Sequence, residues 1–327
     1  MEKIKTAIAG TGMISHMFGE AALQSGLYDL TAVLSRRKET GEAFASEFGI
    51  KNIFTDMDTF LENGDFSVLY LALPNTMHFR YAAQAIRAGK HVIIEKPAFM
   101  SLQEGKELFD LADACGVLVF EAARHMHDQN FAILKDTVDQ MGEITGAVMR
   151  YVKYSARYDK VLRGEQTNIF DPAYGGGALN DLGIYLVYAA VALWGKPKDA
   201  HYYPRIIRTG VDGSGIAILE YDNFSAALMP GKTMNTHLGC EFYSDQYLLE
   251  VDSVAPISKM TLTERVTGRI RELAKPIPDN FLCEEIAALA GMIQNRENAT
   301  VQEKYIRLRQ LSLDVHEVME KLRDSST

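Results

Sequence analysis

Short apolar runs alternate with longer helical patterns through the first third of the chain. The apolar runs cover residues 4–9, 30–34, 68–73, 91–94 and 117–120, and the helical patterns cover 13–24, 39–48, 79–88 and 102–114. Glycine follows each helical pattern within two residues, as a helix stop often requires. Because parallel strands are covered on both faces, such runs predict a doubly wound, mainly parallel sheet.

The pattern changes after about Arg124. One helical pattern at 131–141 precedes strand-like stretches at 144–155, 200–208, 214–221, 224–229 and 238–250. Strands with few intervening helices predict a large, mainly antiparallel open sheet. The run Gly175–Gly177 opens one more helix over 178–194, and two apolar stripes near the C-terminus predict packing helices. We therefore expect an α/β protein of two domains, residues 1–123 and 124–327.

Composition and charge narrow the classes of partner. The 327 residues include 34 Lys and Arg against 43 Asp and Glu, a net charge of −9 that argues against nucleic-acid or anionic-membrane binding. The three cysteines lie far apart and no histidine cluster has zinc spacing, so we predict no metal site. We find no export segment and no apolar run of about 18 residues, and therefore expect a cytoplasmic protein with no membrane contact.

A glycine-rich turn follows the first predicted strand. Gly10 and Gly12 precede Met13 and Ile14, which open the first predicted helix. In this context, glycines let backbone amides and the helix N-terminus approach a pyrophosphate. The turn therefore predicts a Rossmann domain with a dinucleotide-binding site in residues 1–123. The alternative interpretation is a tight strand-to-helix turn without a ligand.

The end of the second predicted strand indicates which dinucleotide binds. A site that prefers NAD usually offers a carboxylate here for the ribose 2′-hydroxyl, but this chain has Ser35, Arg36 and Arg37. Arginine suits a phosphate and also stacks on an aromatic ring. We therefore predict that NADP(H) is preferred, with NAD(H) use left open. A solvated basic turn is the alternative.

Two further segments end strands of the same predicted sheet. Leu73, Pro74 and Asn75 follow one strand, and Glu95 and Lys96 follow the next. Ligands of doubly wound sheets bind at the carboxyl ends of the strands, so we expect these five residues beside the nicotinamide and its ribose.

His78 lies three residues after Asn75. It is either a cofactor neighbour or a packing residue.

Lys96 and a pair of residues far along the chain form the candidate chemistry. Asp181 and Tyr185 are spaced i and i+4 on the helix that follows the glycine run, so both project from one face. Lys96 follows a buried strand and precedes Pro97, which restricts the backbone. An ammonium, a carboxylate and a phenol together suit proton transfer to or from a substrate oxygen.

These motifs, taken in order, resemble a known family. The G-x-G turn at residues 10–12, Leu73-Pro74-Asn75, Glu95-Lys96-Pro97 and the run from Gly175 to Tyr185 are similar to those of the glucose-fructose oxidoreductase, inositol dehydrogenase and rhizopine-catabolism (Gfo/Idh/MocA) family. The resemblance spans essentially the whole chain. Tyr185 stands where the inositol dehydrogenase branch has histidine. A tyrosine at this position is similar to the dihydrodiol dehydrogenase and NADP-dependent xylose dehydrogenase branch.

The resemblance implies reversible hydride transfer between a nicotinamide and a sugar, polyol or diol carbon. Tyr185 would exchange the hydroxyl proton, Lys96 would orient the oxygen, and Asp181 would position the substrate and the lysine. An ordinary phenol has a pKa near 10, so its use at neutral pH needs roughly 3 to 4 kcal/mol of phenolate stabilisation. Alternatively, Lys96 is the acid or base and Tyr185 the orienting group.

Several expectations remain secondary. Arg124 and Asn168 are weaker candidates for substrate contact. The resemblance also implies a homodimer or homotetramer formed through the C-terminal sheet. The main alternative function is a catalytically silent dinucleotide-binding sensor or corepressor, and a nicotinamide-assisted glycosidase ranks third.

Overall fold

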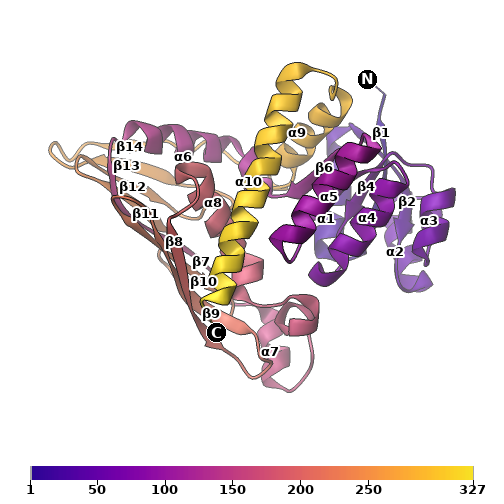
Figure 1. The fold of residues 1–327 in the computed structure, drawn as a ribbon, viewed down its shortest axis with the longest axis horizontal. Helices are drawn as coiled ribbons and strands as arrows, with labels where there is room; N and C mark the ends of the chain where they lie inside the picture. Colours follow the sequence, from indigo (N-terminus) through magenta and orange to yellow (C-terminus); the bar gives the residue numbers. More distant parts are fainter. Residues whose placement is uncertain (1, 327) are drawn as a thin grey trace. The chain divides into compact units, whose positions relative to one another are not determined.

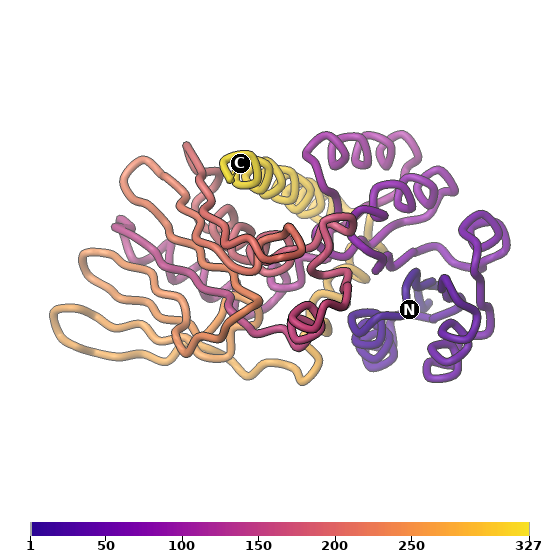
Figure 2. The backbone as a smooth tube through the Cα atoms, turned by 90° about the horizontal axis from the view of Figure 1, so that it is seen from below, coloured from indigo at the N-terminus to yellow at the C-terminus, as the bar shows by residue number. Residues whose placement is uncertain are grey.

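The computed structural model describes residues 2–326 of the chain. The chain divides into two compact units (Figures 1 and 2). The first contains the residues up to Ala122 together with Pro278–Gln310, and the second contains Ala123–Ile277 together with the residues from Leu311 onward. The chain thus leaves the first unit after Ala122 and returns to it at Pro278.

The first unit is built on a six-stranded parallel sheet. Its strands are β1 (Ile4–Ala9), β2 (Tyr28–Leu34), β3 (Asn52–Phe54), β4 (Val68–Leu71), β5 (His91–Glu95) and β6 (Val119–Ala122). They are ordered β3-β2-β1-β4-β5-β6, so the order reverses between β1 and β4. This arrangement confirms the predicted doubly wound sheet, and β4, β5 and β6 are buried throughout, as coverage of both faces requires.

Helices connect these strands and cover the sheet (Figure 1). They are α1 (Met13–Ser25), α2 (Lys38–Phe48), α3 (Met57–Asn63), α4 (His78–Arg87) and α5 (Leu102–Cys115). The prediction missed β3 and α3. A strand of three residues without a buried side chain leaves no apolar run for sequence reasoning to detect.

The return of residues 278–310 to the first unit corrects the expectation of a single boundary. Helix α9 (Cys283–Gln294) buries Ile286 and Leu289, and the preceding Leu282 joins them, in the same apolar cluster as Phe18 of α1. The apolar stripe predicted here is therefore confirmed, and the surface that it covers belongs to the first unit. A stripe shows that a helix is buried and does not show against which partner.

The second unit contains an eight-stranded sheet, whose hairpins are the long adjacent loops of Figure 2. The strands are β7 (Ile144–Val152), β8 (Asp199–Ile206), β9 (Asp212–Glu220), β10 (Ser225–Gly231), β11 (Cys240–Ser244), β12 (Tyr247–Val251), β13 (Met260–Glu264) and β14 (Ile270–Glu272). Their order is β14-β13-β12-β11-β7-β10-β9-β8, and every pair is antiparallel except β7 with β10. The predicted, mainly antiparallel sheet is confirmed.

Two strand predictions in this sheet were wrong. The stretch 238–250 is two strands, β11 and β12, which turn at Asp245 and Gln246. Strands β13 and β14 were missed because their outward positions carry Thr, Glu and an exposed Ile instead of a continuous apolar run.

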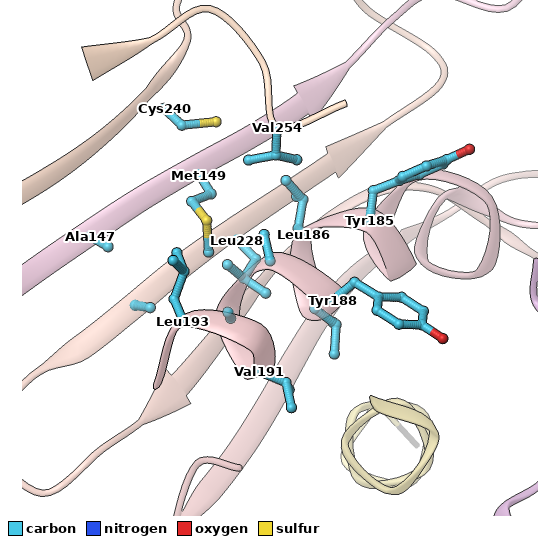
Figure 3. Packing of buried hydrophobic residues seen from close by; sticks show 14 of the residues in the cluster. Ala147, Met149, Tyr185, Leu186, Tyr188, Val191, Leu193, Leu228, Cys240 and Val254 are labelled. Atoms are coloured by element: carbon cyan, nitrogen blue, oxygen red, sulfur yellow. The ribbon is translucent and has the colours of Figure 1, made fainter. Parts of the chain in front are cut away.

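One face of this sheet is covered by helices. Helix α6 (Gln129–Gln140), helix α8 (Ile184–Trp194) and the second half of α10 (Ala299–Asp324) share one apolar cluster with the inward strand residues. Figure 3 shows Leu186 and Leu193 of α8 near Met149 and Leu228 of the sheet. The helix that carries the candidate Tyr185 is therefore part of the core of this unit.

The segment Pro172–Trp194 corrects one sequence expectation. By length and composition it is apolar enough to cross a membrane, with a hydropathy of 1.4 in its best window. However, 78% of that window is buried inside the protein, as in the core helix of a globular unit. The burial explains its composition without a membrane.

Candidate active site

The turn between β1 and α1 has the geometry that a pyrophosphate needs. Gly10 has a φ of 103°, and a side chain there would lie 2.3 Å from the Ala72 carbonyl oxygen, so only glycine fits. Around Gly12 the space is open, and no side chain caps the first turn of α1. Its amides therefore remain available to an anionic ligand. Met13 is exposed and Ile14 half-buried at the start of the helix.

The end of β2 is basic and its serine is already oriented. The Ser35 hydroxyl lies 2.6 Å from that of Thr40, while Arg36 and Arg37 are exposed. Within residues 2–326, neither guanidinium forms an ion pair, whereas the neighbouring Lys38 lies 3.6 Å from Glu42. Two unpaired guanidinium groups at this position fit a ribose 2′-phosphate, which a carboxylate would repel.

The backbone around Lys96 is held by buried polar groups on both sides. The Tyr70 hydroxyl donates to Glu95 Oε1 at 2.5 Å, and the Ala98 amide donates to Glu121 Oε1 at 3.0 Å. These partners lie on β4 and β6, the two strands that flank β5. Lys96 thus leaves the carboxyl end of β5 from a backbone fixed by its neighbours.

His78 joins this segment to the preceding strand end. Its two ring nitrogens each lie 2.8 Å from a carbonyl oxygen, Nδ1 from that of Pro97 and Nε2 from that of Leu73. The ring is fully buried, and burial lowers the pKa of His78. A neutral ring donates from only one nitrogen, so His78 donates to one of these two carbonyl oxygens and lies beside the other, between the Leu73 segment and the Lys96 segment. Leu73, Pro74 and Asn75 are half-buried at the same sheet edge.

In the second unit, the glycine run sets the start of the candidate helix. Gly177 has a φ of 123°, and a side chain there would lie 2.1 Å from Asp212 Oδ1. The Leu179 amide donates to Asp212 Oδ2 at 2.7 Å, and the Tyr202 hydroxyl donates to the same oxygen at 2.6 Å. Burial raises the pKa of the Asp212 carboxyl. The carboxyl group therefore anchors the first turn of the helix.

The turn that carries Asp181 is not α-helical. Leu179–Gly183 forms one π-helical turn, which continues into α8 with Tyr185 in its first turn. Such turns are rare and occur frequently at functional sites. Sequence reasoning predicted one continuous α-helix from 178, and the π turn corrects that expectation.

Tyr185 lies among cationic and aromatic neighbours. The guanidinium carbon of Arg124 lies 5.3 Å from the centre of the Tyr185 ring, and the Tyr151 ring centre lies 5.4 Å away. Arg124 is buried and donates from Nη2 to the Ala255 carbonyl oxygen at 2.6 Å. Burial lowers the pKa of the Arg124 guanidinium, but Tyr185, Tyr151 and Asp128 outweigh it, so that pKa is raised. Figure 3 shows the Tyr185 hydroxyl pointing away from the packed centre of the cluster.

Asp181 forms an ion pair that sequence reasoning missed. Its Oδ2 atom accepts from Nζ of Lys232, a residue that directly follows β10. The Lys232 side chain is only 4% exposed. A signal was present, since Lys232 follows a strand just as Lys96 does, but no motif drew attention to it.

Within the second unit, the structure also locates the two weaker candidates for substrate contact. Arg124 contacts Tyr185, as described above. Asn168 is exposed on a short 3-10 turn, Asn168–Phe170, whose Phe170 ring lies 5.5 Å from Lys232 Nζ. No group of three or more potential metal ligands occurs within residues 2–326.

Comparison with known proteins identifies the two halves of the chain. The family description "Oxidoreductase family, NAD-binding Rossmann fold" matches residues 4–123, and "GFO/IDH/MocA C-terminal domain" matches residues 134–244. The uncharacterized oxidoreductase YgjR of Escherichia coli is 31% identical over 89% of this chain and 88% of its own length. The scyllo-inositol 2-dehydrogenase (NADP(+)) IolU of Bacillus subtilis is 31% identical over 98% of this chain and 96% of its own length.

A solved structure shows the same fold. The 3-ketoreductase KijD10 of Actinomadura kijaniata, in complex with NADP and TDP-benzene, has a TM-score of 0.85 and 23% identity over 99% of this chain and 98% of its own.

The fold and the sequence matches together define an NAD(P)-dependent oxidoreductase. The chain belongs to the Gfo/Idh/MocA family. The alternative of a catalytically silent sensor gains no support from the relatives, which are named as dehydrogenases and reductases where an activity is named.

Proposed function

We propose that the protein transfers hydride, with NADP(H), to or from a carbon that bears a hydroxyl or carbonyl group in a sugar, polyol or related diol. The nicotinamide, when bound, supplies or accepts the hydride. The protein has to bind the substrate oxygen and move its proton. The relatives named above include an inositol dehydrogenase and a 3-ketoreductase, which supports this substrate class.

Three residues share the work on the substrate oxygen in this proposal. Tyr185 exchanges the proton of the hydroxyl group, Lys96 orients that oxygen, and Asp181 positions the substrate. The Arg124 guanidinium beside the Tyr185 ring favours the ionised phenol, because a nearby cation stabilises a phenolate. The assignment with Lys96 as the acid or base and Tyr185 as the orienting group stays open.

The observation that carries the proposal is the fixed backbone around Lys96. A lysine at the carboxyl end of β5, held through Glu95, Pro97 and Ala98, stands where ligands of doubly wound sheets bind. The half-buried Lys96 side chain therefore starts from a fixed point of the backbone at this edge of the sheet.

Turnover of single variants tests this proposal. Tyr185→Phe and Lys96→Met should each lower kcat by about 100-fold or more, with NADPH affinity largely retained, because each removes a group that acts on the substrate oxygen. The assay follows NADPH formation from NADP with scyllo-inositol and D-xylose as probes, and Lys198→Met, which removes an exposed lysine, is the control. Unchanged turnover in both variants would refute the assigned roles.

We also propose that NADP(H) is preferred because Ser35, Arg36 and Arg37 bind the 2′-phosphate. Replacing both arginines by alanine should weaken NADPH binding by at least about 10-fold, while NADH binding changes little, since NADH lacks that phosphate. Fluorescence titration of both nucleotides measures this difference. Equal losses for NADPH and NADH would remove the argument for phosphate recognition.

The outer face of the second sheet supports the proposed homodimer or homotetramer. Tyr203 and Ile216 are cross-strand neighbours there and are 66% and 46% exposed. Exposed apolar side chains on a sheet face favour association with a second copy. Light scattering on the purified protein gives the mass, and a monomer at micromolar concentration would contradict the proposal.

A cytoplasmic location completes the proposal. Cys115, Cys240 and Cys283 are all free thiols, as a reducing compartment favours. Cell fractionation with an antibody against the protein tests it, and recovery outside the cytoplasm would contradict it.

A further inference from the structure

Lys232 is a buried cation that the proposed chemistry does not yet use. It follows β10 directly, and its side chain is 4% exposed, against 35% for its ion-pair partner Asp181. An ammonium group so far from water is unfavourable unless a counter-ion and further partners compensate the lost hydration. Asp181 is the described counter-ion.

The backbone of Lys232 is held on both sides. Its amide donates to the Gly213 carbonyl oxygen at 2.8 Å, and its own carbonyl oxygen accepts from the Ser155 amide at 2.9 Å. These partners lie on β9 and at the start of the segment that leads into α7 (Ala156–Leu162). The backbone from which the Lys232 side chain projects is therefore fixed by two neighbouring elements.

An aromatic ring completes the surroundings of the ammonium group. The centre of the Phe170 ring lies 5.5 Å from Lys232 Nζ, and Phe170 is fully buried. The ring excludes water from that side and attracts the cation through its π face. The Asp181 carboxylate is the partly exposed member of the pair, so it is the member that a ligand can reach.

We propose that Lys232 is a positioning residue of the active site, which holds Asp181 as an ionised and oriented acceptor for a hydroxyl group of a polyhydroxylated substrate. This inference rests on the proposed function. Lys232 acts through Asp181, since its own side chain is almost wholly buried. An anchored Asp181 carboxylate favours substrates that carry a free hydroxyl group beside the reacting carbon, because that hydroxyl group donates a hydrogen bond to the carboxylate. A substrate without it would leave the carboxylate oxygen without a donor.

Kinetics of Lys232→Met with NADP and either scyllo-inositol or D-xylose test this role. We expect kcat/KM to fall by about 30-fold or more, and Lys232→Arg, which keeps the charge, to recover part of the loss. The acid limb of the kcat/KM profile should also move to higher pH, because the carboxylate loses the cation that favours its ionised form. A purely structural role would leave that limb in place.

Lys198→Met is the matched control. Lys198 also pairs with an aspartate, Asp222, in the same unit, but both side chains are about two-thirds exposed (68% and 71%). We expect its kinetics and its pH profile to equal those of the wild type, since an exposed ion pair contributes little.

A double variant keeps the test decisive if Lys232→Met alone does not fold. In Asp181→Asn/Lys232→Met the pair carries no charge, and its kcat/KM should lie within about 2-fold of Asp181→Asn alone if Lys232 acts through Asp181. A further large loss in the double variant would overturn the inference, and so would wild-type kinetics for Lys232→Met. If the wild type turns over no probe, the proposed function itself fails, and this inference fails with it.

Discussion

The imidazole of His91 is buried at the start of β5, where its Nδ1 atom accepts a hydrogen bond from the Leu118 amide at 2.8 Å. Burial, with a smaller contribution from the charge of Arg296, lowers the pKa of His91 to about 4 from its ordinary value of 6.5. An accepting Nδ1 atom has no proton, so the hydrogen bond and the lowered pKa describe the same neutral ring.

This ring makes folding stability depend on pH. Between its two pKa values the unfolded chain binds a proton that the folded chain does not, so stability falls as the pH is lowered through this range. We expect His91 to account for a loss of about 2 kcal/mol between about pH 7 and about pH 5. Urea unfolding at both pH values measures the loss, which should be smaller by about 2 kcal/mol in His91→Gln and unchanged in the exposed His237→Gln.

Residues with a motif were within reach of sequence reasoning, and residues without one were not. Gly10 was predictable because its conformation leaves no room for a side chain. The turn therefore requires glycine, and a glycine after a predicted strand is visible in the sequence. Lys232 was not, because its partner Asp181 is 51 positions away and only the folded sheet brings them together. The roles of Lys96, Asp181 and Tyr185 stay predictions that kinetics must test.

At the scale of elements, a buried carboxyl group begins the helix that carries the candidate residues. Asp212 accepts from the Leu179 amide and the Tyr202 hydroxyl, so it fixes where the π turn starts. The capping residue Asp212 lies on strand β9, far along the chain from the helix. No Ser or Thr immediately before the helix marks its start in the sequence.

Removing this cap should therefore affect both stability and turnover. Asp212→Ala leaves the Leu179 amide and the Tyr202 hydroxyl without their acceptor, and we expect a loss of about 1 to 3 kcal/mol in the free energy of unfolding. We also expect a lower kcat, because the turn that holds Asp181 loosens. Tyr202→Phe, which removes one hydrogen bond and keeps the ring, should lose less. A stable Asp212→Ala with full turnover would show that the anchor is dispensable.

Elements were predicted well where burial produced a clear apolar pattern in the sequence, and poorly where it did not. Strand β4 and helix α8 are apolar throughout, strand β5 is apolar between His91 and Glu95, and all three were predicted. Helix α7, with a single buried residue, Val161, and the polar strand β14 gave no such signal. The pairing of β7 with β10 as parallel neighbours also lies beyond any local pattern, since 72 residues separate the two strands.

At the scale of the whole molecule, the first unit is discontinuous in sequence. Its core needs Leu282, Ile286 and Leu289 from the returning segment, because these side chains share a cluster with Phe18. The predicted domain 1–123 lacks them. The sequence indicated the right number of units but could not show that the chain revisits the first.

Fragments test the importance of this return. Residues 1–123 alone should aggregate or unfold without cooperativity, since the face covered by α9 would be exposed to water. The same fragment joined by a flexible linker to residues 278–310 should unfold cooperatively and bind NADPH. Circular dichroism during heating and nucleotide fluorescence measure the two properties. Equal stability of both fragments would show that the returning segment is an accessory.

Strand β7 lies between β11 on one side and β10 on the other. The strands β8 to β10 and β11 to β14 are otherwise two separate meanders, each joined by neighbouring hairpins that can form early from local contacts. Strand β7 precedes both meanders in the sequence and is synthesised first. It cannot complete its hydrogen bonds until both meanders have formed. Strand β7 therefore joins the two meanders, and the eight-stranded sheet is complete only when β7 has paired with both β10 and β11.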